Sequence, residues 1–209
     1  MSTRAIIILA GGRSFRLGYD KAFIRFEGTP FVTHILDRLR PLGDESLVSI
    51  GKNSKIEDCR SVLPNDAIIV QDNVHFQRPL AGFASTLQKC RSTVCFLVAC
   101  DMPFVEPKVV EFLFRQNDKS GSVVPRWNDG RIEPLHAVYE RDAARHGVSE
   151  AIKEQSLSMI GLVEHTPDVH FVSVENEIKP IDPSLKILSN FNTPRDFASL
   201  DRDSADRHE

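Results

Sequence analysis

The chain has 209 residues, of which 41% are hydrophobic and 26% are charged, and its formal net charge is −3. It has neither a run of about eighteen apolar residues nor a signal-peptide pattern, which excludes a membrane protein, and the negative net charge excludes a nucleic-acid footprint over the whole molecule. We therefore expect a cytoplasmic protein with one domain over residues 1–200, a disordered acidic tail over residues 201–209, and no nucleic-acid or membrane partner.

The first predicted element is a buried strand at residues 4–9 that runs into a glycine-rich turn. Its short, continuous, β-branched sequence is typical of a parallel strand covered on both faces. Gly11 and Gly12 allow the backbone to approach a ligand closely, and the cations Arg16 and Lys21 follow them. The spacing fits neither a P-loop nor a dinucleotide fingerprint. We interpret the turn as another kind of phosphate-binding loop, the alternative being a solvated surface turn.

After this loop, helices alternate with short apolar strands. Thr29 and Pro30 are predicted to be the N-cap and first residue of a helix that Pro41 ends. Further strands are predicted at residues 46–50, 67–71 and 94–99, and further helices at residues 53–62, 79–88 and 107–116. This repeat indicates a mostly parallel sheet with right-handed crossovers.

The regular alternation of strands and helices ends after residue 120. Strands are predicted at residues 122–125, 135–139 and 169–174, and helices at residues 141–154, 158–164 and 193–200. Asn128, Asp129 and Gly130 form a strong turn signal between the first two of these strands. The complete pattern predicts an α/β fold.

Two aspartates follow predicted strands and should lie at the carboxyl edge of the sheet, where such sheets bind ligands. Asp101 follows the most apolar strand. It would meet a divalent cation beside a bound phosphate, because Mg²⁺ prefers one or two carboxylates together with phosphates and water. Asp72 would suit a ribose hydroxyl, a base edge or the metal. The alternative for Asp101 is a helix cap or a turn residue, and the alternative for Asp72 is a turn residue.

The chemistry that these residues favour is phosphoryl-group transfer without a covalent nucleophile. The histidines show no metal-ligand spacing, and no serine or cysteine stands in a nucleophile-elbow pattern. Positioning and charge neutralisation would then carry the reaction. A phosphate monoester that attacks is already largely dianionic at neutral pH, since its second pKa is about 6. No general base is then required.

Residues 9–21 read LAGGRSFRLGYDK, which closely resembles the signature of molybdenum cofactor guanylyltransferases. Three further segments match that family in the expected order, namely PLAG at residues 79–82, CDMP at residues 100–103 and NFNTP at residues 190–194. Leu17 replaces the usual Met, which conserves volume. Arg78 stands where the family usually has Gly, so it either contacts phosphate or indicates a modified acceptor.

The resemblance implies a nucleotidyltransferase fold, a Rossmann-like three-layer sandwich around a mostly parallel mixed sheet. It implies that GMP is transferred from GTP to the terminal phosphate of molybdopterin, with Mg²⁺ as cofactor and pyrophosphate as the second product. The product is the guanine dinucleotide form of the cofactor. Molybdoenzymes or other proteins of cofactor biosynthesis would be the protein partners.

The resemblance also implies roles for individual residues. The nucleotide would lie against Leu9, Ala10, Gly11, Gly12, Lys21, Asn53, Asp72 and Asp101. The catalytic residues would be Arg16, Lys21 and Asp101, and Asp101 would bind the metal. The acceptor would lie against Arg78, Arg131, Pro134, Asn190 and Asn192.

Two other functions remain open. A cytidylyltransferase acting on molybdopterin or another phosphorylated small molecule would use the same chemistry. Related pyrimidine-nucleotide enzymes, however, tend to show Ala-Ala-Gly where this chain has Ala10, Gly11 and Gly12. A non-catalytic carrier of nucleotide or cofactor would bind tightly without releasing pyrophosphate. The presence of both Asp101 and Lys21 favours an enzyme.

Overall fold

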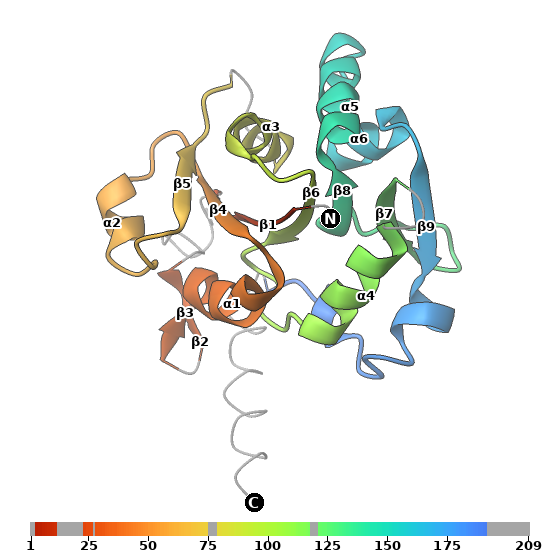
Figure 1. Ribbon diagram of the computed structural model, residues 1–209, viewed down its shortest axis with the longest axis horizontal. Helices are drawn as coiled ribbons and strands as arrows, with labels where there is room; N and C mark the ends of the chain where they lie inside the picture. Colours follow the sequence, from red (N-terminus) through yellow and green to blue (C-terminus); the bar gives the residue numbers. More distant parts are fainter. Residues whose placement is uncertain (1–2, 12–22, 27, 75–78, 118–120, 192–209) are drawn as a thin grey trace, which may run out of the picture.

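One seven-stranded sheet runs through the part of the chain that the computed structural model describes, which is residues 3–11, 23–26, 28–74, 79–117 and 121–191 (Figure 1). Its strand order is β5-β4-β1-β6-β8-β7-β9. The strands are β1 (Arg4–Leu9), β4 (Glu45–Ile50), β5 (Ile68–Gln71), β6 (Val94–Ala99), β7 (Ser122–Arg126), β8 (His136–Glu140) and β9 (Val169–Ser173).

The strand directions make the sheet mixed but mostly parallel. β1 pairs in parallel with β4 and β6, β4 with β5, and β7 with β9, whereas β8 is antiparallel to both β6 and β7. Because β8 alone is reversed in this sheet, the carboxyl ends of β6 and β7 and the start of β8 all lie at one edge. The predicted α/β class with a mostly parallel mixed sheet is confirmed.

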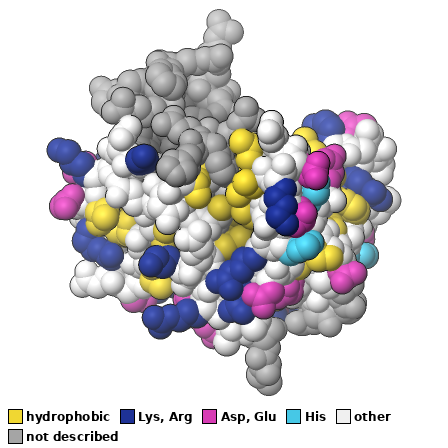
Figure 2. Space-filling view, turned by 90° about the horizontal axis from the view of Figure 1, so that it is seen from above, with side chains coloured by type: hydrophobic (Ala, Val, Ile, Leu, Met, Phe, Trp, Pro, Cys, Tyr) yellow, Lys and Arg dark blue, Asp and Glu magenta, His cyan; other side chains and the backbone are white. Residues whose placement is uncertain are grey.

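Helices cover both faces of the sheet, which gives three layers (Figure 1). One face packs against α1 (Phe31–Leu39) and α4 (Pro107–Asn117), and the other against α3 (Pro79–Lys89), α5 (Arg141–Lys153) and α6 (Met159–His165). The short helix α2 (Ile56–Arg60) lies beside β5. On the outer face above α3 and α5, basic and acidic side chains are interspersed with apolar ones (Figure 2).

Strand β1 shows how the two cores arise from one sequence. Side chains alternate across a strand, so Ile6 and Ile8 join the core under α1 and α4, whereas Ile7 joins the core under α3 and α5. All three isoleucines are fully buried, and each contributes about 1.5–3 kcal/mol of hydrophobic stabilisation. The predicted strand covered on both faces is therefore confirmed.

Several predicted boundaries were wrong for local reasons. Thr29 and Pro30 do not open α1 as N-cap and first residue; they form strand β3 (Thr29–Pro30), which pairs with β2 (Arg25–Phe26), and Pro30 is the N-cap. The helix predicted at residues 53–62 is only α2, because a turn closed by the Ser54 N–H on the Gly51 carbonyl precedes it.

The chain after β9 holds two short helical turns that the sequence did not predict. A π-helical turn, η3 (Val174–Ile178), directly follows β9, and a 3₁₀ turn, η4 (Lys186–Leu188), lies further on. The predicted helix at residues 193–200 and the predicted tail lie outside the described residues. In the described part of the chain, no helix combines the length and apolar character needed to cross a membrane.

Candidate active site

The backbone after β1 keeps pairing with its neighbours beyond the strand. Ala10 N–H donates to the Ser49 carbonyl at 2.8 Å, and Cys100 N–H donates to the Leu9 carbonyl at 3.0 Å. Next to them, a Cβ added at Gly11 would lie 3.0 Å from the backbone nitrogen of Gly51. Only glycine fits this approach without displacing the neighbouring backbone, so the start of the predicted phosphate loop is fixed by main-chain packing.

Asn53 lies on the exposed turn that follows β4. Ser54 N–H donates to the Gly51 carbonyl at 2.9 Å and closes the turn. From β5, the side-chain amide of Gln71 donates to the Lys52 carbonyl at 3.0 Å and to the Ser54 carbonyl at 2.9 Å. Two strands thus hold the turn that presents Asn53 at the carboxyl edge of the sheet.

Asp72 follows β5 and is held by both its backbone and its side chain. Its N–H donates to the Ile50 carbonyl at 3.0 Å, and its Oδ1 accepts a hydrogen bond from the buried Ser49 hydroxyl at 2.9 Å. Burial raises the pKa of Asp72, and the Ser49 hydrogen bond opposes that rise. Helix α3 packs against this pair through Gly82, where an added Cβ would lie 2.5 Å from Ser49 Oγ and 3.3 Å from Asp72 Oδ1.

Asp101 lies on the turn after β6, next along the same edge. Met102 N–H donates to the Ala99 carbonyl at 3.1 Å, and Phe191 N–H donates to the Asp101 carbonyl at 2.9 Å. This second bond brings Asn190 and its neighbours to Asp101 from the far end of the described chain. Asp101 is partly exposed, which a side chain would need in order to share a cation with bound phosphates.

The carboxyl edge continues into the connection between β7 and β8, residues 127–135, which we call the 127–135 loop. The register pairs Val98 with His136, so Pro134 lies beyond the end of β6 on the side of Asp101. The Tyr139 hydroxyl donates to the Pro134 carbonyl at 2.8 Å and holds the returning chain. Arg131 is exposed in this loop and forms an ion pair with Asp129 at 2.8 Å.

The comparisons with known proteins agree with this geometry. The family profile described as "MobA-like NTP transferase domain" matches residues 6–165. The chain is 35% identical over 204 residues to a Methanosarcina mazei protein named probable molybdenum cofactor guanylyltransferase, covering 95% of this chain and 90% of that protein. The chain belongs to the MobA-like NTP transferase family. The predicted family resemblance is confirmed, and the protein is a nucleotidyltransferase.

Solved structures support the fold of this MobA-like transferase. Molybdopterin-guanine dinucleotide biosynthesis protein A from Archaeoglobus fulgidus has a TM-score of 0.81 at 24% identity, covering 97% of this chain and 99% of that one. A Mycobacterium tuberculosis protein in complex with manganese has a TM-score of 0.59 at 18% identity, covering 83% of this chain and 88% of that one. Both identities are low enough that the likeness concerns the fold.

The structure of this MobA-like transferase brings most of the predicted site residues to one edge. Those predicted to bind the nucleotide define what we call the nucleotide half, and those predicted to bind the acceptor define the acceptor half. The first set is Leu9, Ala10, Gly11, Asn53, Asp72 and Asp101, and the second is Arg131, Pro134 and Asn190. The remaining predicted residues, Gly12, Arg16, Lys21, Arg78 and Asn192, lie outside the described residues. Sequence reasoning missed Ser49, although a serine inside an otherwise apolar strand is a signal for such a role.

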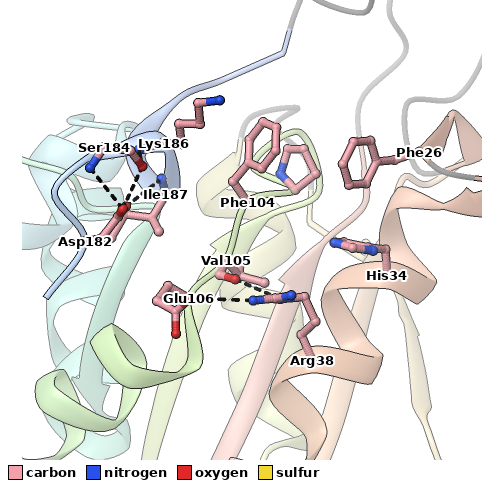
Figure 3. Close-up of a pocket in the computed structure, with 11 residues that line it drawn as sticks. Phe26, His34, Arg38, Phe104, Val105, Glu106, Asp182, Ser184, Lys186 and Ile187 are labelled. Atoms are coloured by element: carbon pink, nitrogen blue, oxygen red, sulfur yellow. Dashed lines mark hydrogen bonds and ion pairs between the residues drawn. The ribbon is translucent and has the colours of Figure 1, made fainter. Parts of the chain in front are cut away.

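A cavity of ≈ 210 Å³ opens behind the Asp101 turn, between α1 and the chain after η3 (Figure 3). Phe26 and Phe104 line its upper side, and Arg38 lies 3.6 Å from the Glu106 carboxylate below them. Arg38 Nε also donates to the Val105 carbonyl at 3.0 Å. The charged side chains on this wall therefore already have partners within the protein.

Among the described residues, no group of three or more His, Cys, Asp and Glu side chains is placed to hold a metal. A magnesium ion that is coordinated by one carboxylate together with substrate phosphates and water does not need such a group. The partly exposed Asp101 at the sheet edge, with its backbone held on both sides, fits that mode of coordination.

Proposed function

We propose that this protein transfers GMP from GTP to the terminal phosphate of molybdopterin, with release of pyrophosphate. The product is the guanine dinucleotide form of the cofactor. The observation that carries the proposal is the convergence of Gly11, Asp72 and Asp101 at one sheet edge. The name of the Methanosarcina mazei relative, which matches over nearly the full length of both chains, supports the choice of base and acceptor.

In this proposal, the nucleotide half binds GTP. The backbone at Gly11 approaches the triphosphate, and Arg16 and Lys21 neutralise the charge that develops on the leaving pyrophosphate. Asn53 and Asp72 approach the guanosine end. Asp101 would hold Mg²⁺, which supplies charge neutralisation at the phosphates when it is bound.

The reaction needs little from the protein beyond positioning. An oxygen of the molybdopterin phosphate attacks the α-phosphorus of GTP in line, a new P–O bond forms, and the bond to the β-phosphate oxygen breaks. The attacking phosphate is already deprotonated near neutral pH, because its second pKa is about 6. The backbone bonds of Leu9, Ala10 and Asp101 orient the groups around the reacting phosphates.

The experiment that tests the proposal is pyrophosphate release from GTP, CTP and ATP, each with Mg²⁺, in the presence and absence of molybdopterin. Release from GTP that depends on molybdopterin is the expected result. Release from CTP would identify a cytidylyltransferase. Binding of GTP without release from any nucleotide would identify a carrier and overturn the proposal.

We place this reaction in the cytoplasm, as the composition of the chain leads us to expect, and propose that molybdoenzymes or other proteins of cofactor biosynthesis receive the product. Capture of such proteins on the tagged enzyme after turnover is the expected result. Capture that is equally strong without GTP and molybdopterin would argue against transfer of a product.

A further inference from the structure

The 127–135 loop holds Arg131 in a defined orientation. The Arg131 guanidinium donates through Nε to Asp129 Oδ2 at 2.8 Å, and its backbone N–H donates to Asp129 Oδ1 at 3.0 Å. The guanidinium carbon lies 5.1 Å from the centroid of the Trp127 ring, within cation–π range. No described residue accepts a hydrogen bond from the two terminal nitrogens of Arg131, which therefore remain available to a ligand.

Trp127 is itself fixed from several directions. Its indole N–H donates to the Glu133 carboxylate at 2.6 Å. Its backbone N–H donates to the Arg131 carbonyl at 2.8 Å, and its carbonyl accepts from Gly130 N–H at 2.9 Å. Glu133 is fixed in turn, because its backbone N–H donates a hydrogen bond to the Pro125 carbonyl at 2.9 Å. The ring under Arg131 is therefore a fixed platform.

These contacts contribute orientation more than fold stability. The side chains of Arg131 and Asp129 are 67% and 56% exposed, and ion pairs as exposed as this one stabilise a fold very little. A guanidinium that is already oriented loses less rotamer freedom when a ligand binds. This arrangement is expected at a recognition site, and its loss should leave the fold intact.

The charges of the loop decide which part of an acceptor suits it. The carboxylates of Asp129, Glu133 and Glu175 all act on Arg131 and raise its pKa. Glu175 reaches the loop by accepting from Asn128 N–H at 3.1 Å. The 127–135 loop and Glu175 together carry one cation, Arg131, and three carboxylates, and this local surplus of negative charge disfavours a phosphate. A flat, neutral heterocycle with N–H donors and a carbonyl acceptor matches it.

The loop also stands in the right place for the acceptor. The pairing of Val98 with His136 brings the loop to the edge where β6 delivers Asp101, beyond the half of the sheet that carries Gly11 and Asp72. A ligand that extends from Asp101 away from the nucleotide half passes this loop. Molybdopterin presents its phosphate to the reaction and therefore presents its pterin ring further along.

We propose that Trp127 is a positioning residue that, with Glu133, holds Arg131 to bind the pterin ring of the acceptor, and that this loop does not bind the acceptor phosphate. The inference rests on the proposed function and adds to it the acceptor group that this half of the site recognises. Arg131 donates to the pterin carbonyl or a ring nitrogen, and the surrounding carboxylates accept from the amino group of the ring.

The chain offers a matched control in the same region. Arg126, at the end of β7, lies 4.5 Å from the centroid of the Phe171 ring, so it also forms a cation–π contact. It stacks on Phe171 of β9, and among the described residues no carboxylate pairs with it as Asp129 pairs with Arg131. Replacing Arg126 removes the same charge and the same kind of contact one residue before Trp127, and it tests for non-specific effects.

The experiment measures molybdopterin-dependent pyrophosphate release from GTP for wild type, Trp127→Ala, Arg131→Ala, the double variant and Arg126→Ala. We expect Arg131→Ala to raise the KM for molybdopterin about tenfold or more, and Trp127→Ala about fivefold, with the KM for GTP unchanged. The double variant should be no worse than Arg131→Ala, because Trp127 acts through Arg131.

A competition assay identifies the group that is recognised. Pterin without side chain or phosphate should compete with molybdopterin in wild type and Arg126→Ala, and about tenfold less well in Arg131→Ala. Competition by inorganic phosphate that depends on Arg131 would overturn the assignment to the ring. Equal effects of Trp127→Ala and Arg126→Ala on the KM for molybdopterin would overturn the positioning role.

A measurement without turnover keeps the two proposals separate. Trp127 is the only tryptophan of the chain, so its quenching by acrylamide reports on this platform alone. Arg131→Ala should increase the quenching, Arg126→Ala should not, and equal quenching in all three proteins would overturn the stack. A wild-type protein that shows the stack but releases no pyrophosphate with molybdopterin would overturn the proposed function instead.

Discussion

The two halves of the sheet edge are held by different kinds of contact. In the nucleotide half, the backbone of Gly11 lies against Gly51, and Gly82 of α3 packs against Ser49. The spacing there is set by backbone atoms of Gly51 and by the buried, hydrogen-bonded hydroxyl of Ser49. In the acceptor half, exposed side chains hold one another, as Arg131 does with Asp129. Substitutions in the first half should therefore cost stability and binding together, whereas those in the second should cost recognition alone.

The largest expected effect belongs to Asp101, which lies where the two halves meet. Asp101→Ala should lower turnover by about 10³-fold or more, because it removes the proposed metal carboxylate, while its backbone bond to Phe191 and the fold survive. Pyrophosphate release and thermal unfolding measure the two effects. Asp66→Ala, which removes an exposed partner of Arg40, is the control, and an active Asp101→Ala enzyme would refute the metal assignment.

The second prediction concerns acid sensitivity, which should originate in the acceptor half. His136 of β8 is fully buried, none of the described groups hydrogen-bonds its ring nitrogens, and burial lowers its pKa to about 3. The unfolded chain takes up a proton below pH 6.5 and the folded chain does not, so stability is lost as the pH falls from 6.5 toward 3.

By pH 5 this loss amounts to about 2 kcal/mol. His136→Met, of similar volume, should flatten the pH dependence of the free energy of unfolding and keep or raise stability at neutral pH. Urea unfolding of wild type and variant at several pH values between pH 5 and 8 measures this pH dependence. An unchanged slope in the variant would show that another group is responsible for the acid sensitivity.

In the nucleotide half, Gly82→Ala should destabilise the fold by about 1–3 kcal/mol and raise the KM for GTP. The added methyl group would lie 2.5 Å from Ser49 Oγ, which is buried and held by its hydrogen bond to Asp72. The double variant Gly82→Ala with Ser49→Ala removes that oxygen and should recover part of the stability. If the losses in the free energy of unfolding from the two single substitutions simply add in the double variant, as measured by urea unfolding, the contact between Gly82 and Ser49 would be contradicted.

The smallest expected effect is a gain in stability when Asp72 is replaced. Asp72 has a raised pKa, so folding favours its neutral form, and the contribution to stability is lost as the pH rises through the folded pKa. Asp72→Asn should therefore stabilise the protein at neutral pH by a few tenths of a kcal/mol, since solvent partly screens the site. Its KM for GTP should rise. A stabilised variant with unchanged GTP kinetics would remove Asp72 from the site.

The parallel half could be predicted from sequence more accurately than the rest. The strands at residues 4–9 and 94–99 were predicted with both ends correct, because continuous β-branched and apolar runs indicate fully buried strands. The start of α1 was predicted one residue too early. Thr29 is a good N-cap in isolation, but its pairing with Phe26 in the short hairpin takes it out of the helix.

What could not be predicted depends on contacts between side chains that no local sequence pattern specifies. The resemblance and the strand ends indicated Asp72 and Asp101, but Ser49 acquires its role only through Asp72, which comes from the next strand. The sequence predicted a turn around Asn128, yet the stacking of Arg131 on Trp127 depends on how that turn closes. The sequence pattern predicts the strands and where they end. The Ser49–Asp72 pair is set by the register between β4 and β5, and the Arg131–Trp127 pair by the closure of a turn.

The bond between Phe191 N–H and the Asp101 carbonyl also bears on how the enzyme is made. The last strand of the sheet ends at Ser173, so every strand can pair before Phe191 has left the ribosome. The turn that carries Asp101 gains its final support only afterwards. A nascent chain can thus hold every strand of the described sheet before the turn that carries Asp101 has its last backbone bond, so the proposed metal site is completed after the sheet.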